Sequence, residues 1–278
     1  MASVRDIPFA AAKQVVDGVH SSSMARRSCV RVAIEIDEGA PRGLVLAIKQ
    51  AFVPRTATGL VHVAAFGAGS QVRVNPDCDI AIVVSGSSGA ATSVARGFAS
   101  AAVPCAIVVE TSVEVPATEQ PAGVEVIAAA DDQTLLDKLA TWMASACRAD
   151  IALGTNFPFV RHAIAKRCVG ERSAKNAAIG LLPFGSSADL PIMAANETLM
   201  AIDVAGVYGE GASAARFAEA ACVIGAAFAS RAVARKLSQS LPGLGAVVKA
   251  GVAYGATLAM GEALVLRFEM PNAWKHRN

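Results

Sequence analysis

Two short glycine-rich segments are the places in this chain best suited to bind a phosphate group. Residues 66–70 (FGAGS) and 85–89 (SGSSG) each follow an apolar run, as the phosphate-binding turns of parallel sheets do. Their glycines are Gly67, Gly69, Gly86 and Gly89. Glycines also cluster in ordinary turns, so nucleotide or phosphate binding is here an alternative interpretation and not the main one.

The sequence does not encode a complete nucleotide site. A phosphate loop needs GxxxxGK[ST] after a first strand, because its backbone N–H groups and its lysine surround the phosphates. The corresponding turn, IDEGAPRGLV (36–45), has Asp37 and Glu38 where a triphosphate would be repelled, and no Lys-Ser or Lys-Thr pair. Guanine recognition would need Asn-Lys-x-Asp where this chain has VVETSVEV (108–115). We therefore expect neither GTP hydrolysis nor a bound cofactor.

The histidines and cysteines form no catalytic or metal-binding pattern. His62 alternates with apolar residues and is expected to be a core or sheet-edge residue, whereas His162 lies among basic residues on a helix. No Cys–His or Ser–His–carboxylate spacing suggests a nucleophile, and no pair at i,i+4 suggests a metal. The six scattered cysteines without CxxC are typical of a reducing cytoplasm. A non-enzymatic function is expected.

Polar residues inside the apolar helices of the second half are a second group of candidates. They are Asn176, Asp189, Asp203, Arg231, Arg235 and Glu262. Buried charges must be paired, so we predict interhelical ion pairs of Arg231 or Arg235 with Asp203 or Glu262. A polar cleft that binds a small molecule is the alternative. Asp189 before Leu-Pro is also predicted to cap a helix.

Gly251 and Gly255 form a GxxxG stripe within the last apolar segment. Such a stripe allows a tight helix crossing in a soluble bundle, or dimerisation in a membrane. The charge-free runs of this half, 176–188, 220–230 and 250–261, are shorter than the roughly 18–20 residues that a bilayer requires. The soluble bundle is therefore favoured, with the membrane surface as an alternative.

Composition narrows the class of partner. Hydrophobic residues make up 54% of the 278 residues and aromatic residues only 5%, which favours helices packed through small side chains. The net charge is +2 without a dense basic cluster, so nucleic-acid binding is disfavoured. Charges within the first 19 residues interrupt any signal-peptide pattern, and we expect a short amphipathic helix there.

The elements that must position these residues fall into two classes. The first half alternates apolar strands with helices, which predicts a mostly parallel sheet covered on both faces. The expected strands are 29–37, 60–66, 78–86, 103–111 and 124–130, and the expected helices are 42–52, 91–102 and 131–147. From residue 150 only helices are predicted, at 157–169, 173–182, 189–209, 213–241 and 243–269.

Two series of motifs in the second half resemble a known family. The first is NAAIGLLPF (176–184), ADLP (188–191) and VYG (207–209), and the second is RAVAR (231–235), LPGLG (241–245), AYGAT (253–257) and MGEA (260–263). Together they resemble the YcjF-like domain-of-unknown-function family, in a form seen in actinobacterial hypothetical proteins. The resemblance covers roughly residues 150–269. It implies a hydrophobic helical bundle of a kind that follows or accompanies GTPase-type domains. It does not imply a particular reaction.

The resemblance also makes the first half look like a degenerate GTPase-like α/β domain. The expected organisation is an N-terminal arm (1–28), this α/β domain (29–148), a YcjF-like helical domain (149–270) and a tail (271–278). The expected function is a scaffold or regulatory protein that acts through protein association or self-association. A GTPase is a candidate partner, and the expected location is cytoplasmic or peripheral to the inner membrane.

Overall fold

The computed structural model describes residues 7–69, 74–115, 118–181, 186–211 and 245–270. The chain divides into two compact units, one of residues 27–164 and one that joins residues 1–26 to residues 165–278. We call them the sheet unit and the helical unit. The division lies inside a helix at residue 164 and not at the predicted 148, and the N-terminal helix belongs to the helical unit instead of forming a separate arm.

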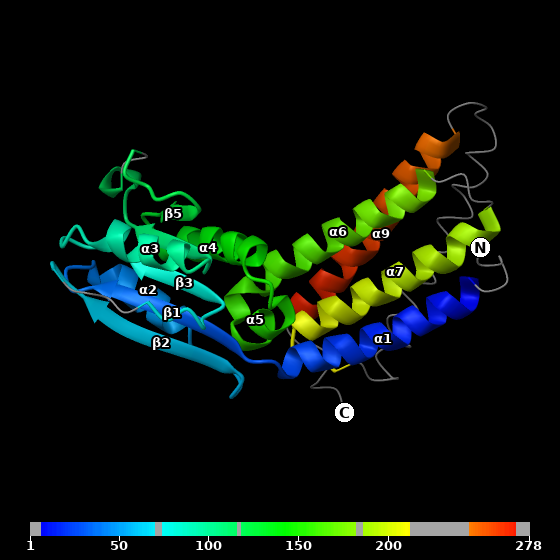
Figure 1. Cartoon of the computed structure of the whole chain (residues 1–278). Coiled ribbons are helices and arrows are strands. Elements are labelled where there is room, and N and C mark those ends of the chain that lie inside the picture. Colours follow the sequence, from blue (N-terminus) through cyan, green and yellow to red (C-terminus); the bar gives the residue numbers. More distant parts are fainter. Residues whose placement is uncertain (1–6, 70–73, 116–117, 182–185, 212–244, 271–278) are drawn as a thin grey trace. The chain divides into compact units, whose positions relative to one another are not determined.

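The sheet unit is built on five parallel strands in the order β2-β1-β3-β4-β5 (Figure 1). The strands are β1 (Val30–Asp37), β2 (Gly59–Phe66), β3 (Ile80–Val84), β4 (Cys105–Val109) and β5 (Val124–Ala128). Every residue of β3 and β4 is buried, as expected for central strands covered on both faces. β2 is an edge strand, and most of its side chains are at least partly exposed.

The connecting helices of the sheet unit are α2 (Arg42–Ala51), α3 (Ala91–Ser100), α4 (Asp132–Ala146) and α5 (Asp150–Asn156). Because the crossovers from β1 to β2 and from β3 to β4 run in opposite directions, right-handed connections place α2 and α3 on opposite faces. α4 contacts α2. It is capped by Asp131, whose carboxylate accepts a hydrogen bond from the Thr134 amide at 2.9 Å.

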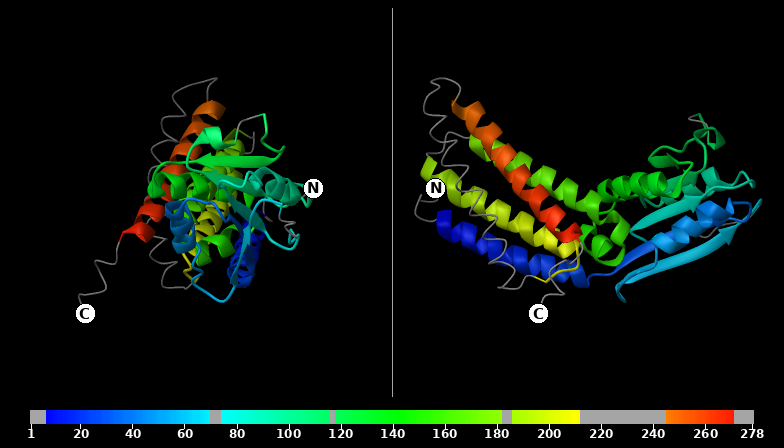
Figure 2. Two further views of the ribbon diagram at one scale, coloured as in Figure 1. Left: turned by 90° about the vertical axis from the view of Figure 1, so that its left-hand side faces the viewer. Right: turned by 180° about the vertical axis from the view of Figure 1, so that it is seen from behind.

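The helical unit consists, in its described part, of α1 (Ile7–Arg27), α6 (Arg161–Leu181), α7 (Ser186–Val207) and α9 (Gly245–Glu269). Figure 2 shows α1 in blue beside α7 in yellow-green, and α9 in orange to red beside α6 in green. A core of apolar residues joins α6, α7 and α9. Its members are Ala165, Val169, Met200, Ala201, Val204, Met260, Leu264 and Val265.

Glycines set the closest helix approaches. A Cβ on Gly18 would overlap the Leu199 side chain, so α1 packs directly on α7. A Cβ on Gly180 would lie 3.1 Å from the Ala250 backbone, and a Cβ on Gly261 would lie 2.9 Å from Val169 Cβ. The small residues of this half therefore do allow tight crossings, as their abundance predicts.

The predicted position of the tight crossing on the last helix was wrong. Gly251 and Gly255 are exposed, and a Cβ added to either would meet no described atom within 4 Å. The crossings use Ala250 and Gly261 instead, on another side of α9. A GxxxG pattern identifies a smooth helix face, but it does not say whether the same chain covers that face.

Three other helix boundaries differ from the sequence prediction. The predicted helices 157–169 and 173–182 form one continuous helix, α6, because a single Gly170 between strong helix formers costs only about 1 kcal/mol. α5 was not predicted as a separate helix. α7 begins at Ser186, so Asp189 lies within its first turn and is not the cap, and the predicted helix 213–241 lies outside the described residues.

Among the described residues, one stretch, Asp189–Val207 of α7, is long and apolar enough to cross a membrane. More than half of that stretch is buried inside the fold, as in the core helix of a soluble protein, so the composition alone is weak evidence for a span.

Substituting two glycines of α9 tests this packing. Gly261→Ala should lower the free energy of unfolding by about 1–3 kcal/mol, because the stiff Val169 side chain fills the space. Gly255→Ala should raise it by about 0.5–1 kcal/mol, because an exposed helical glycine gains helix propensity without a clash. Urea denaturation of both variants measures the difference, and equal effects would contradict the assignment of buried and exposed faces.

Candidate functional site

The carboxyl ends of β1 and β3 form the position where open parallel sheets bind ligands. In the order β2-β1-β3-β4-β5, the connections leave β1 and β3 in opposite directions, which makes this the switch point of the sheet. Asp37 ends β1 here and is almost fully buried. Its carboxylate accepts hydrogen bonds from the Gly39 amide at 2.8 Å and from the Ser88 hydroxyl. Asp37 thus ties the loop after β1 to the loop after β3.

The four candidate phosphate-binding glycines serve other purposes at this edge. A Cβ on Gly86 would lie 2.8 Å from Ala40 Cα, so the two loops pack directly on each other. A Cβ on Gly67 would lie 2.9 Å from the Glu38 carboxylate. Gly69 and Gly89 have φ of +78° and +71°, which a turn residue with a side chain would rarely adopt. The Asp37 and Glu38 carboxylates and the close packing of the two loops therefore oppose the binding of a phosphate here.

A buried carboxylate lies farther inside the sheet unit. Glu35 on β1 is only 3% exposed, and its Oε2 has no hydrogen-bond partner among the described residues. Burial raises the pKa of this carboxyl, and the nearby His62 on the exposed edge strand partly opposes that effect. Burial also raises the pKa of Cys78 to about 11 and that of Cys105 to about 12, so neither thiol supplies a thiolate at neutral pH.

In the helical unit, three helices meet at one buried polar network. Asn176 on α6 donates hydrogen bonds to Thr257 Oγ1 of α9 at 2.8 Å and to Glu197 Oε1 of α7 at 3.2 Å. Thr257 in turn donates to the same Glu197 oxygen at 2.9 Å. The Asn176 carbonyl accepts from Asn196 Nδ2 at 2.8 Å. We call these four residues the buried network.

Arg172 extends the buried network toward the surface. Its guanidinium donates to Asp203 Oδ2 at 2.6 Å and to Asn196 Oδ1 at 3.1 Å. Burial raises the pKa of Asp203, and the charge of Arg172 opposes that shift. The interhelical polar contacts thus fix the register of α6 against α7.

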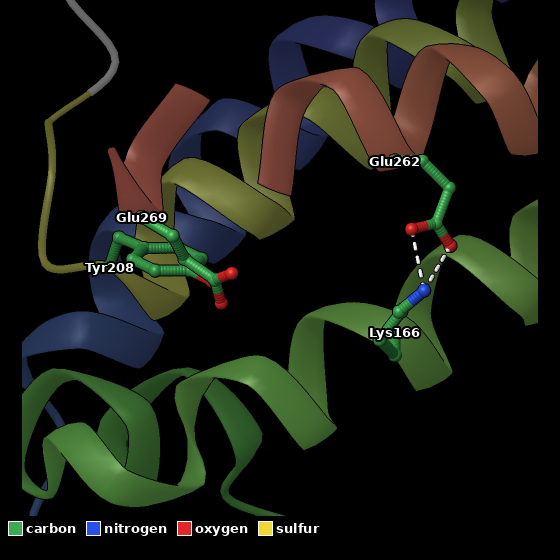
Figure 3. A network of polar contacts seen from close by, with 4 residues as sticks. All are labelled: Lys166, Tyr208, Glu262 and Glu269. Atoms are coloured by element: carbon green, nitrogen blue, oxygen red, sulfur yellow. Dashed lines mark hydrogen bonds and ion pairs between the residues drawn. The ribbon is translucent and has the colours of Figure 1, made fainter. Parts of the chain in front are cut away.

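The acids have partners, among the described residues, that the sequence did not predict. Asp203 pairs with Arg172, and Glu262 pairs with Lys166, whose Nζ lies 2.6 Å and 2.5 Å from its two oxygens (Figure 3). Lys249 on α9 reaches the buried Asp189 at 2.9 Å. Arg231 and Arg235, the predicted partners, lie outside the described residues, so their pairing stays a prediction.

A second contact between α7 and α9 lies at the ends of both helices. The Tyr208 hydroxyl donates to Glu269 Oε1 at 2.7 Å, and the Tyr208 ring stacks on Phe268 with centroids 5.1 Å apart. Figure 3 shows Tyr208 and Glu269 side by side at the end of α9, apart from the Lys166–Glu262 pair. Both helix ends are therefore fixed, and the interhelical polar groups are engaged with one another.

One face of α9 is apolar and exposed along most of the helix. Val247 is 65% exposed and Tyr254 is 40% exposed, and Leu266 is exposed near the other end. Gly251, Gly255, Ala259 and Ala263 are exposed on the same side of the helix, which also carries Glu262, bound to Lys166. We call this set of residues the α9 face. A surface helix of a soluble protein normally has charged residues there.

Lys166, Arg172, Lys249 and Thr257 were not among the sequence candidates. Lysine and arginine in polar stretches usually lie on the surface, and a single threonine in an apolar helix is unremarkable in sequence. Only the pairing of α6 with α7 and α9 places them beside the acids. Among the described residues, no group of three or more His, Cys, Asp or Glu side chains is placed to hold a metal ion.

The Asn176 side chain can be tested by its removal. Asn176→Leu should destabilise the protein by roughly 3–5 kcal/mol, because it leaves the Glu197 carboxylate and its neighbours buried with fewer donors. Ala178→Leu, an exposed change on the same helix, should shift stability by less than about 0.5 kcal/mol. Urea denaturation of both variants measures this, and equal stabilities would mean that the buried network adds nothing.

Glu35 predicts a pH-dependent effect. Its pKa is raised in the folded state, so the folded chain binds this proton more tightly than the unfolded chain. The free energy of unfolding therefore falls as the pH rises from the unfolded-state pKa through the folded-state pKa. Glu35→Gln should therefore raise the melting temperature more at about pH 8 than at about pH 4.5. Glu125→Gln, on the exposed side of β5, is the control. If Glu35→Gln raised the melting temperature at acidic pH only, the burial of a charged Glu35 would be contradicted.

Comparisons with known proteins give no relative from which a function could be transferred. No protein-family model matches the sequence, no curated protein matches it, and no solved structure matches it. The residues and their arrangement are therefore the basis on which function is inferred.

Proposed function

We propose that this protein acts without catalysis, as a scaffold or regulatory protein that binds another protein through the α9 face. The observation that supports this most strongly is the long apolar surface from Val247 to Leu266, which the described part of the chain leaves exposed. Large apolar patches on a soluble protein are typical of binding sites for other macromolecules. The Asp37 and Asn176 clusters, in contrast, are engaged with their own neighbours.

The chemistry of the α9 face favours an apolar helix of a partner protein over lipid. Gly251 and Gly255 are four residues apart, so a second helix could approach the backbone of α9 closely. Lipid chains gain little from exposed glycines, because glycine offers less apolar area than a bulky side chain at the same position. Glu262 also lies beside this face, bound to Lys166, and a charged pair is costly in hydrocarbon.

The relation to the YcjF-like family and to a degenerate GTPase-like domain is part of this proposal. The motif residues of α7 and α9, among them Thr257 and Gly261, supply interhelical contacts, which agrees with a motif that maintains a helical architecture. The parallel sheet agrees with a nucleotide-binding ancestor at the level of fold class alone. We propose a cytoplasmic protein whose partner is a GTPase-type or membrane-peripheral protein.

The two alternative functions have less support. A degenerate phosphate site would have to form at the loops that Asp37 and Gly86 pack together, beside the Glu38 carboxylate. A small-molecule cleft between helices would have to form where Asn176, Glu197 and Thr257 already bind one another. The first arrangement would place a phosphate beside two carboxylates, and in the second the donors of Asn176 and Thr257 are already engaged.

Three variants of the full chain test the proposed function. Tagged wild-type protein and its variants are recovered from native cells, and the proteins bound to each are quantified by mass spectrometry. Tyr254→Asp places a charge on the α9 face, and Gly255→Leu blocks close helix approach while keeping the face apolar. Val113→Asp changes another exposed valine, one in the sheet unit, and is the control. We expect both α9 variants, and not Val113→Asp, to lose the same partner.

The interaction is then measured with the purified partner, where each α9 variant should weaken binding by at least about tenfold, or 1.4 kcal/mol. Flotation with vesicles of anionic phospholipid tests the membrane alternative on the same proteins. Vesicle binding that Tyr254→Asp abolishes and Gly255→Leu strengthens would contradict a protein partner. Unchanged melting temperatures of the variants exclude misfolding as the cause.

A further inference from the structure

We propose that the exposed edge of β2 is a second, independent interface, on which two copies of this chain pair their sheets in antiparallel orientation. β2 pairs with β1 on one side through all eight residues, from Gly59 opposite Val30 to Phe66 opposite Asp37. No described strand lies on its other side. As far as the structure describes the chain, the outer backbone groups of β2 are therefore available to another strand.

The edge lacks the sequence devices by which edge strands are normally protected. Its sequence, GLVHVAAF, contains no lysine, acid or proline, and its register with β1 runs without a bulge. Exposed edges usually carry a charge, a bulge or a covering segment, because a flat apolar edge pairs with other strands. Apart from His62, this eight-residue edge is apolar, and its regular register favours pairing with another strand.

Both faces of β2 offer apolar contacts to an added strand. Leu60 is 46% exposed and Val63 is 56% exposed, and strand alternation places them on opposite faces of the sheet. A strand added to β2 would thus be held by side chains above and below as well as by backbone hydrogen bonds. In this respect β2 differs from the α9 face, which presents a single helical surface.

The charges at the two ends of β2 favour a second copy in antiparallel orientation. Glu38 lies beside Gly67 at the carboxyl end, and Arg55 is exposed just before the amino end. Antiparallel pairing places the end of β2 that carries Glu38 in one copy beside the end that carries Arg55 in the other, twice. Parallel pairing would place like charges together. A two-fold axis perpendicular to the sheet generates this arrangement. If the axis passes beside Val63, residues 60–66 of one copy pair with residues 66–60 of the other, and the two Val63 residues face each other.

A charge at Val63 tests this interface in the full chain. Light scattering after size exclusion, at high micromolar concentration, should give a dimer for the wild type and a monomer for Val63→Lys. The control Val113→Lys, which adds the same charge at another exposed valine of this unit, should remain dimeric. A monomeric wild type, or a Val63→Lys variant that is still dimeric, would overturn the proposal.

A cysteine at the same position tests the orientation. Val63→Cys should form a cross-linked dimer under mild oxidation, because the axis places the two introduced thiols opposite each other. Mass spectrometry should then identify a disulfide that joins two copies of the peptide carrying the substitution. Val113→Cys should give no such peptide, and a cross-link at neither position would overturn the antiparallel pairing.

The two interfaces are tested separately by exchanging their variants between the two assays. Tyr254→Asp should remain dimeric, because it leaves β2 unchanged. Val63→Lys should still bind the partner of the α9 face, because it leaves α9 unchanged. Failure of one interface is therefore distinguishable from failure of the other.

Discussion

The helical unit depends on one buried constraint, which is that Asn176, Glu197 and Thr257 must bind one another. These side chains come from α6, α7 and α9 and are fully buried, so each would lose solvation without gaining a partner if a helix moved or rotated. Apolar packing between alanine-rich and valine-rich helices is tolerant of sliding. A hydrogen-bonded network is not, and it therefore fixes one register of the three helices.

The consequence of this register is that the helices have a buried side and an exposed side. Gly180 and Gly261 lie at crossings, where only hydrogen fits. Gly251 and Gly255, on the same helix as Gly261, face away from the other described helices. The network thus accounts for the α9 face, because it turns the polar residue Thr257 inward and leaves an apolar surface outward. The sheet unit also has an occupied side and an exposed side. At the carboxyl ends of its strands Asp37 ties the loops together, whereas along β2 the edge of the sheet is exposed.

Much of the architecture follows from the sequence alone. All five strands and the helices between them were predicted, since continuous runs such as CDIAIVVSG are typical of buried parallel strands. The strand order was not predictable, because it depends on which way each crossover turns. Asn176, Asp189, Asp203 and Glu262 were correctly expected to bind across helices. Their partners were not, since Lys166, Arg172 and Lys249 are ordinary surface residues until α6, α7 and α9 are brought together.

The central claim, that the α9 face binds a protein, is tested most directly at Tyr254 itself. A photo-cross-linking phenylalanine analogue replaces Tyr254 in the full chain expressed in its native cells, and the same analogue at Val113 is the control. Irradiation should produce one discrete protein adduct from position 254, with the cross-linked partner peptide identified by mass spectrometry, and no such adduct from position 113. Adducts to lipid alone, or the absence of any adduct specific to position 254, would contradict the claim.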